Sequence, residues 1–280
     1  MRSVAELMER LERLKERAKS KTPSTPSPTS SAEYTCPKCK DELFLIDPNN
    51  SWRAIPCPCR EQQLLNRRLK RAMIPEEFEE ATFENFQVKW DHHRRMLDLA
   101  KEYLERFNAL FGTRRSSFGF MARYGEADWI RERGRRRMDD DKNSYGLGKT
   151  HLQMAMAKEL IQRGYTVLCI SDIDLMDRLA SARVLDDGGE EYQKLLDTVI
   201  QPDVLVWDDL GKSKASEFNF RTYYTIINER WRQKKPIIFS TNESGKTLVE
   251  KIDMAAYSRL LDMAQGFLVE LSGPDYRMKG

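Results

Sequence analysis

The sequence has no apolar run of about 18 residues or more, and this absence excludes a transmembrane helix. The first 20 residues, MRSVAELMERLERLKERAKS, also lack the uncharged apolar core of a secretory signal peptide. Neither sign of charge is in large excess, since the net charge is only +3, so any nucleic-acid-binding surface must be local. We therefore expect a cytoplasmic protein, in which five cysteines favour a metal site or free thiols over disulfides.

The length and composition fit one full α/β domain with a smaller appendage. The chain has 280 residues, of which 40% are hydrophobic and 32% charged, which is an ordinary balance for a packed core. Five segments are expected: an amphipathic N-terminal helix (1–20), a flexible linker (21–35), a module with four of the five cysteines (36–75), a helical connector (76–116) and an α/β domain (117–280).

The N-terminal segment predicts a helix with one apolar stripe, because its apolar residues recur at helical spacing: Val4, Leu7, Met8, Leu11 and Leu14. Such a helix either packs on its own domain or docks on a partner. The following stretch, KTPSTPSPTSSAEYT, is too rich in Pro, Ser and Thr to form a core, which favours docking.

From about residue 117, short apolar segments alternate with helical ones. Strands are expected at 118–122, 166–171, 203–207, 236–240 and 267–271, with helices at 149–163, from 172 onward and near 216–233. Short β runs separated by helices are typical of a parallel sheet covered on both faces. We predict an α/β fold with a parallel sheet flanked by helices.

A phosphate-binding loop is predicted just before the expected helix at 149. Glycine lets backbone N–H groups approach a phosphate closely, and the positive end of the helix dipole favours the anion. The ammonium of Lys149 would reach the β- and γ-phosphates, and the hydroxyl of Thr150 would bind magnesium. The expected nucleotide contacts are Tyr145, Gly146, Leu147, Gly148, Lys149 and Thr150.

The loop departs from the pattern G-x-x-x-x-G-K-[ST], because Asn143 stands where the first glycine belongs. One explanation is a plain substitution, since asparagine also tolerates left-handed backbone angles. The other is an insertion: Gly125-Glu126 would open the loop, residues 127–144 would interrupt it, and it would resume at Tyr145. The interrupting segment carries clustered arginines and aspartates, and it is either a self-neutralising solvated loop or a contact to DNA phosphates.

Polar side chains end two of the predicted strands. Asp208 and Asp209 follow the strand 203–207 directly, at the sheet edge where ligands of open α/β sheets bind. Asp208 is suited to hold magnesium and Asp209 to polarise the attacking water. Asn242, after the strand 236–240, can hydrogen-bond a water or the γ-phosphate, although asparagine is also a routine turn residue there.

Four cysteines form two close pairs, Cys36 with Cys39 and Cys57 with Cys59, separated by 17 residues. Two pairs at this distance suit a tetrahedral zinc site with four thiolate ligands, which would replace a core that the segment is too short to build. Reduced, unliganded thiols are the alternative. Cys169 lies in a predicted strand and is expected in the core, whereas His92 and His93 are expected on a helix surface.

The segments GLGKTHL, DVLVWDDLG, PIIFSTNES, YSRLL and GPDYR, in this order, resemble the AAA+ helicase loaders of the DnaC and DnaI type, with the IstB transposition helpers as close relatives. IPEEFEEATFENF resembles the segment that joins a zinc module to the ATPase in loaders of the DnaI kind. The resemblance covers residues 36–125 and 145–277. It implies a P-loop AAA+ sheet with ATP, Mg²⁺ and Zn²⁺ as cofactors.

Position by position, the resemblance assigns further roles. Lys149 and Thr150 look like the Walker A pair, Asp208 like the Walker B ligand, and Asn242 like sensor 1. Asp209 stands where many AAA+ proteins have the catalytic glutamate. Arg259 resembles the arginine finger that reaches the ATP of the next subunit, with a surface ion pair as its alternative role, and Arg277 is a weaker candidate for the second sensor.

The expected function is an ATPase that loads a hexameric replicative helicase onto single-stranded DNA and that self-assembles through its AAA+ domain. Two alternatives stay open: an IstB-like transposition helper, and a zinc-containing helicase adaptor that does not hydrolyse ATP. Basic residues in the N-terminal half either bind DNA phosphates, bind an acidic protein partner, or form a solvated helix face. No membrane is expected among the partners.

Overall fold

The computed structural model describes residues 34–134, 139, 141–185 and 188–276. The expected helix 1–20, nearly all of the linker and Arg277 lie outside these residues. The chain divides into two compact units, Met1–Arg60 and Glu61–Gly280. Each is described separately below.

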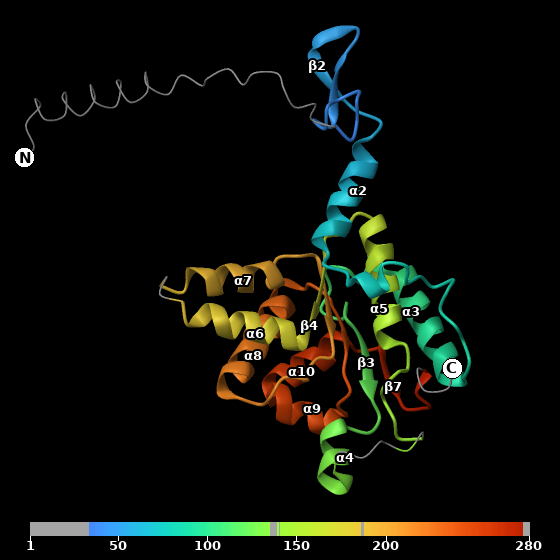
Figure 1. The fold of residues 1–280 in the computed structure, drawn as a ribbon, viewed down its shortest axis with the longest axis vertical. Helices are drawn as coiled ribbons and strands as arrows, with labels where there is room; N and C mark the ends of the chain where they lie inside the picture. Colours follow the sequence, from blue (N-terminus) through green and yellow to red (C-terminus); the bar gives the residue numbers. More distant parts are fainter. Residues whose placement is uncertain (1–33, 135–138, 140, 186–187, 277–280) are drawn as a thin grey trace, which may run out of the picture. The chain divides into compact units, whose positions relative to one another are not determined.

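The described part of the first unit contains a small hairpin (Figure 1), and two of its four cysteines precede the hairpin while the other two follow it. Strand β1 (Phe44–Asp47) pairs antiparallel with β2 (Asn50–Pro56), and Phe44 lies opposite Pro56. The buried hydrophobic side chains there are Leu43 and three of the cysteines, with Leu45 packed beside them. A core this small cannot hold a fold by apolar burial alone, as the sequence predicts.

The second unit contains a five-stranded sheet in the order β4-β5-β6-β3-β7, in which every neighbouring pair is parallel. The strands are β3 (Phe118–Ala122), β4 (Val167–Ser171), β5 (Val204–Asp208), β6 (Ile237–Ser240) and β7 (Leu268–Leu271). All five lie within one residue of their predicted ranges. The predicted α/β class and parallel sheet are confirmed.

Helices cover both faces of this sheet. One core joins alternate strand residues such as Val204, Val206 and Ile238 to α3 (Asp91–Leu110) and α5 (Lys149–Gln162). The other core joins the intervening residues, such as Leu205 and Phe239, to the helices on the opposite face. Those helices are α6 (Asp172–Arg183), α7 (Glu190–Ile200), α8 (Glu217–Gln233), α9 (Gly245–Ile252) and α10 (Met254–Met263).

Segments on both sides of the expected boundary at residue 75 belong to the core of the second unit. Helix α2 (Arg60–Arg71) contributes Leu65 and Leu69, and the 3₁₀ turn η1 (Glu76–Phe78) contributes Phe78, to the same core as α3 and α5. The structural division therefore lies after Arg60, whereas the sequence placed the end of the zinc module at residue 75. Apolar contacts of α2, which the cysteine spacing does not reveal, account for the difference.

None of the helices in the described part of the chain combines the length and the apolar character needed to span a membrane.

Candidate functional site

The site lies at the carboxyl ends of three neighbouring strands. Strand β6 lies between β3 and β5 in the sheet, so the segments that follow these strands meet at one edge. Helix α5 begins beside them, and residues 143–148 form the loop in front of it. This edge brings together Lys149, Thr150, Asp208, Asp209 and Asn242, which all line one cavity of about 670 Å³.

The loop needs glycine at two positions. Gly146 has φ +61° and Gly148 has φ +80°, a left-handed backbone that other residues adopt at a cost. Both also have close neighbours: an added Cβ would lie 1.8 Å from the carboxylate of Asp275 at Gly146, and 2.6 Å from the ring of Phe86 at Gly148. Glycine is therefore the residue that fits both positions of this tight loop.

Lys149 is the first residue of α5 and is only 7% exposed. Its Nζ donates to the backbone oxygen of Ser144 and to Oδ1 of Asn242, each at 2.6 Å. These contacts hold the ammonium of Lys149 at the cavity, where an anionic group can bind.

Asp208 ends β5 and faces the first turn of α5. The hydroxyl of Thr150 lies 3.1 Å from both carboxylate oxygens, and the hydroxyl of Ser240 donates to Oδ1 at 2.6 Å. Burial and the charge of Asp209 raise the pKa of Asp208, while these hydrogen bonds and the charge of Lys149 oppose that change. A divalent cation fits this carboxylate and hydroxyl pair, because hard cations prefer oxygen ligands and would offset the crowded negative charge.

Asp209 and Asn242 face each other across the same edge. Nδ2 of Asn242 donates to Oδ1 of Asp209 at 2.8 Å, and the backbone N–H of Asp209 donates to the hydroxyl of Ser240 at 3.0 Å. Asp209 has φ +52°, so its backbone turns sharply after the strand. The turn aims the carboxylate at the sensor-1 candidate and the cavity.

Aromatic rings also line the cavity. They belong to Phe78, Phe86, His93, His151 and Tyr276, and all six predicted nucleotide contacts from Tyr145 to Thr150 also line the cavity. The cavity therefore offers both cation and hydroxyl groups and flat rings, which are the two kinds of contact that a nucleoside triphosphate uses. The sequence did not identify Phe86 as a lining residue, although it lies in the segment ATFENF noted in the resemblance.

The expectation that His92 and His93 lie on a helix surface is wrong for His93, which is 1% exposed. His93 lies in the first turn of α3, and its Nδ1 accepts the backbone N–H of Lys89 at 3.2 Å. Its ring contacts those of Phe86 and Trp90. Burial, together with the charges of His92 and Lys89, lowers the pKa of His93 to about 4.

The predicted interruption of the loop contains a helix. Between β3 and the phosphate loop lies α4 (Glu126–Arg133), where the sequence indicated a loop. Asn143 closes the interruption: its side-chain Nδ2 donates to the backbone oxygens of Tyr145 and Gly273, and its Oδ1 accepts the N–H of Tyr145. Of the two explanations for Asn143, the structure favours the insertion, because α4 lies between β3 and the phosphate loop.

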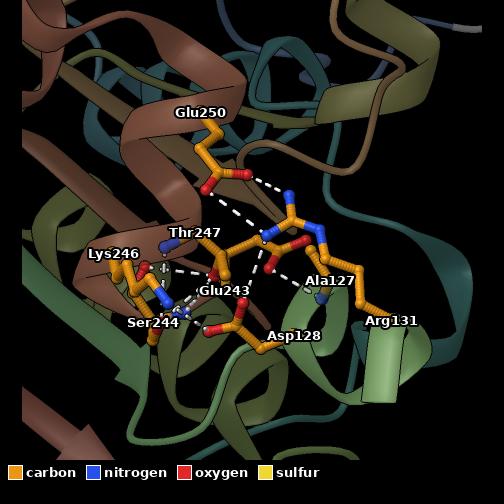
Figure 2. Close-up of polar contacts among 8 residues, drawn as sticks. All are labelled: Ala127, Asp128, Arg131, Glu243, Ser244, Lys246, Thr247 and Glu250. Atoms are coloured by element: carbon orange, nitrogen blue, oxygen red, sulfur yellow. Dashed lines mark hydrogen bonds and ion pairs between the residues drawn. The ribbon is translucent and has the colours of Figure 1, made fainter. Parts of the chain in front are cut away.

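Helix α4 is fixed to α9 by charged and polar contacts (Figure 2). Arg131 pairs with Glu250 on α9 and with Asp128 on its own helix. The N–H of Ala127 donates to Oε2 of Glu243 at 3.1 Å. Arg131 is thus neutralised within the chain, and Arg135, Arg136 and Arg137 lie outside the described residues.

The first residue of α4 contacts all three parts of the site. The backbone N–H of Glu126 donates to the backbone oxygen of Asn242 at 3.0 Å. Its carboxylate accepts from Lys212, in the segment after Asp209, at 2.8 Å, and it also hydrogen-bonds Tyr145 of the phosphate loop. The insertion is therefore attached to the site and does not only extend from it.

Arg259 lies apart from the cavity, on α10. Its Nη1 donates to the backbone oxygen of Ala255 at 3.0 Å, and its guanidinium packs over the rings of Tyr224 and Trp231. It does not line the cavity of its own chain. The surface ion pair considered as its alternative role is not among the ion pairs of the described residues.

The four cysteines converge in the first unit. The Sγ atoms of Cys36, Cys39, Cys57 and Cys59 all lie within 4.8 Å of one another. Four thiolates around a tetrahedral zinc, with Zn–S bonds of about 2.3 Å, lie roughly 3.8 Å apart. The distances of 3.9 Å from Cys36 to Cys57 and 3.4 Å from Cys39 to Cys59 therefore fit this ion.

The surroundings shift the pKa values of two of these cysteines in opposite directions. A hydrogen bond from the backbone of Cys39 and further hydrogen bonds lower the pKa of Cys36 to about 7, whereas burial and hydrogen bonds with the other cysteines raise the pKa of Cys59. The backbone N–H of Cys36 is held by Asp41 Oδ1 at 2.9 Å. Cys169 is 2% exposed in β4, as expected for a core residue.

Comparisons with known proteins match this chain to ATP-binding proteins and to a helicase loader. Residues 143–279 match the family described as "IstB-like ATP binding protein". The chain is 24% identical to the phage-like element PBSX protein XkdC of Bacillus subtilis (strain 168), over 90% of this chain and 88% of that protein. It is 24% identical to the replicative helicase loader DnaC of Escherichia coli (strain K12), over 70% and 69%. It is 29% identical to the insertion sequence IS5376 putative ATP-binding protein of Geobacillus stearothermophilus, over 48% and 53%.

Solved structures show a similar fold. The crystal structure of the DnaC helicase loader matches 70% of this chain and 100% of that one, with a TM-score of 0.55 and 23% identity. That of DnaI matches 72% and 94%, with a TM-score of 0.53 and 19% identity. A DNA replication initiation factor has a TM-score of 0.51 and 24% identity, over 69% of this chain, which spans only 49% of that protein. At these identities, the likeness shows the AAA+ P-loop fold alone.

Replacing Gly148 tests the tight loop. Gly148→Ala places a methyl group against Phe86 in a left-handed backbone, and we expect it to lower the free energy of unfolding by more than the 1–2 kcal/mol that the backbone alone costs. Gly112→Ala is the matched control, because Gly112 has φ +78° and nothing within 4 Å of its added Cβ. Urea denaturation measures both. Equal losses in the two variants would contradict the close packing of Phe86 on the loop.

The buried His93 predicts a pH dependence. An unfolded histidine takes up its proton near pH 6.5, whereas folded His93 does so near pH 4. The unfolded chain therefore binds more protons between these values, and stability falls as the pH is lowered from about 6.5 to 4, by roughly 1–3 kcal/mol. In His93→Asn, the dependence of the unfolding free energy on pH in this range should flatten. The same slope in both proteins would show that His93 titrates normally.

The cysteine cluster predicts one tightly bound zinc per chain. Cys57→Ser should lose that zinc, measured with a chromogenic chelator on the purified full-length protein, because three thiolates no longer close a tetrahedral site. Cys169→Ser, in the core of the second unit, should keep it. Zinc retained by the first variant or lost from the second would assign the metal elsewhere.

Proposed function

Because residues 143–279 form an IstB/DnaC-like ATP-binding domain, we propose that this protein is an ATPase that loads a replicative DNA helicase onto single-stranded DNA. The observation that carries the proposal is the convergence of Lys149, Asp208 and Asn242 at the end of one cavity. In this proposal, the expected zinc module docks on the partner, and the AAA+ domain hydrolyses ATP. The connector joins the two.

The site's residues divide the work of phosphoryl transfer. The ammonium of Lys149, at the start of α5, would neutralise the β- and γ-phosphates, and loop N–H groups there would bind phosphate oxygens. Thr150 and Asp208 would hold Mg²⁺, which when bound supplies charge neutralisation between the phosphates. This arrangement stabilises charge that develops as the γ-phosphoryl group leaves.

Asp209 and Asn242 position the attacking water. The carboxylate of Asp209 accepts a proton or a hydrogen bond from that water, and Asn242 orients the carboxylate through its 2.8 Å hydrogen bond. Because Asn242 also accepts from Lys149 at 2.6 Å, one side chain connects the phosphate-binding group to the general base. A bound γ-phosphate would compete for Lys149 and so affect the orientation of Asn242.

Arg259 acts on the nucleotide of a neighbouring subunit. It is absent from the cavity of its own chain, its guanidinium is held by two aromatic rings, and it pairs with no carboxylate among the contacts described. A cation presented in this way suits charge stabilisation across a subunit boundary, and it makes hydrolysis depend on self-assembly.

The helicase and the single-stranded DNA are proposed as partners because the relative from Escherichia coli is named as a replicative helicase loader. The cysteine module is proposed to hold Zn²⁺ and to serve docking. A helper role in transposition is the second candidate, favoured by the IstB-like family match and the insertion-sequence relative. An adaptor that does not hydrolyse ATP is the third.

The function predicts that wild-type protein hydrolyses ATP and that Lys149→Ala lowers turnover about 100-fold or more, with or without single-stranded DNA. Lys194→Ala is the control, because Lys194 is an exposed residue of α7. Equal, near-zero turnover in wild type and Lys149→Ala would exclude an ATPase, and the adaptor that does not hydrolyse ATP would then be the remaining candidate.

The partner is tested by capture from lysate with and without ATP. Recovery of a hexameric replicative helicase, and its loading onto circular single-stranded DNA by wild type but not by Lys149→Ala, supports the loader. Recovery of a transposase instead would replace the loader with the transposition helper.

A further inference from the structure

A fully buried glutamine lies directly behind the carboxylate of Asp208. Gln153 is 0% exposed, four residues after Lys149 on α5, so the two side chains lie on the same face of the helix. Most other buried side chains of α5 are apolar, for example Leu152, Met154 and Met156. A buried amide in such surroundings lowers stability unless it is hydrogen-bonded, so its partners indicate its role.

Those partners are Asp208 and Ser240. With its amide oxygen accepting the backbone N–H of Ser240 at 3.0 Å, Nε2 of Gln153 donates to Oδ1 of Asp208 at 2.8 Å and to the hydroxyl of Ser240 at 3.2 Å. In the opposite orientation, Nε2 has the backbone oxygens of Trp207 and Ile238 as acceptors, each at 3.4 Å, and the amide oxygen faces the carboxylate of Asp208. The shorter hydrogen bonds and the avoided contact between two acceptors favour the first orientation.

The result is an asymmetric carboxylate. Oδ1 of Asp208 accepts from Gln153 at 2.8 Å and from the hydroxyl of Ser240 at 2.6 Å. The hydroxyl of Thr150 lies 3.1 Å from both Oδ1 and Oδ2, so it does not distinguish them. The asymmetry comes from Gln153 and Ser240, which both donate to Oδ1, so Oδ2 is the oxygen with fewer donors among the contacts of the described residues.

We propose that Gln153 and Ser240 are positioning residues that hold Oδ1 of Asp208, so that Oδ2 and the hydroxyl of Thr150 present a divalent-cation site. This proposal rests on the nucleotide site proposed above. Gln153 belongs to α5, which also carries Lys149, and Ser240 ends β6, just before Asn242. The carboxylate of Asp208, at the end of β5, is therefore held by both of these elements. Neither residue touches the ion, and both act through the carboxylate.

A purely structural role makes a different prediction. If Gln153 only joined α5 to the sheet, its replacement would lower stability and leave the folded protein's affinity for magnesium unchanged. If it positions Asp208, magnesium affinity falls while the magnesium-independent binding of nucleotide by the loop and Lys149 persists. Loss of a hydrogen-bond partner behind a metal ligand typically lowers metal affinity about 10–100-fold.

The experiment uses full-length protein and a fluorescent ATP analogue. Nucleotide affinity is measured in EDTA, and magnesium is then titrated at fixed nucleotide concentration for wild type, Gln153→Met and Ser240→Ala. Methionine keeps the length and volume of the side chain and removes the hydrogen bonds. Gln162→Met is the matched control, because Gln162 is an exposed residue of the same helix.

We expect the magnesium concentration at half-saturation to rise about 10–100-fold in Gln153→Met and in Ser240→Ala. Affinity in EDTA should stay within about twofold of wild type, and Gln162→Met should match wild type in both measurements. Circular dichroism confirms that each variant is folded at the assay temperature. If Gln153→Met does not fold, Ser240→Ala decides, because it removes a donor to the same oxygen with a smaller change.

An unchanged magnesium titration in a folded variant would overturn the positioning role, and the glutamine would then be structural. A parallel loss of affinity in EDTA would also overturn it, because the defect would lie in the loop. Failure of the proposed function has a separate signature: the wild-type protein itself would bind no nucleotide, with or without magnesium.

Discussion

The candidate site depends on one constraint of the sheet, which is that β6 lies between β3 and β5 with all three strands parallel. This order places the segments after the three strands at one edge, so that short side chains can bridge them. The hydrogen bonds of Lys149 with Asn242, and of Ser240 with Asp208, are two such bridges. With any other strand between β3 and β5, Asn242 could not reach both Lys149 and Asp209.

The bridges also make the site a single unit. Lys149, Asn242 and Asp209 form a continuous chain of hydrogen bonds, and Ser240 links Asp209 to Asp208. In a buried setting, such networks are rigid when every member is satisfied and costly when one member is lost. A triphosphate bound as proposed would change the partner of Lys149, and the effect would reach both aspartates through these hydrogen bonds.

The sequence is most informative where short-range patterns are unambiguous. Apolar runs of five residues that are buried on both faces have no competing helical period, so all five strands could be located, and paired cysteines have a spacing that only a compact cluster explains. GLGKT and the aspartate pair carry their chemistry locally. The magnesium and base roles of these residues, and the finger role of Arg259, stay predictions.

The parts that could not be predicted depend on contacts between distant segments. His93 is buried because Phe86 and Trp90, in a segment without periodicity, cover it. Asn143 is held by Gly273, 130 residues away, and Gln153 faces Asp208 only after α5 has packed on the sheet. Helix α4 has few apolar residues, so its pattern indicated a loop, and its stability comes from partners on α9.

The insertion of α4 has a consequence for how the phosphate loop is ordered. In a continuous P-loop, the strand leads directly into the loop, whereas here the chain leaves at Gly125 and returns at Asn143, and bringing these ends together has a loop-closure entropy that grows as about (3/2)RT ln n. That loss is offset in part by exposed ion pairs such as Arg131 with Glu250. Dissolved ions screen exposed pairs over a Debye length of about 8 Å at physiological salt, so the order of this loop varies with ionic strength.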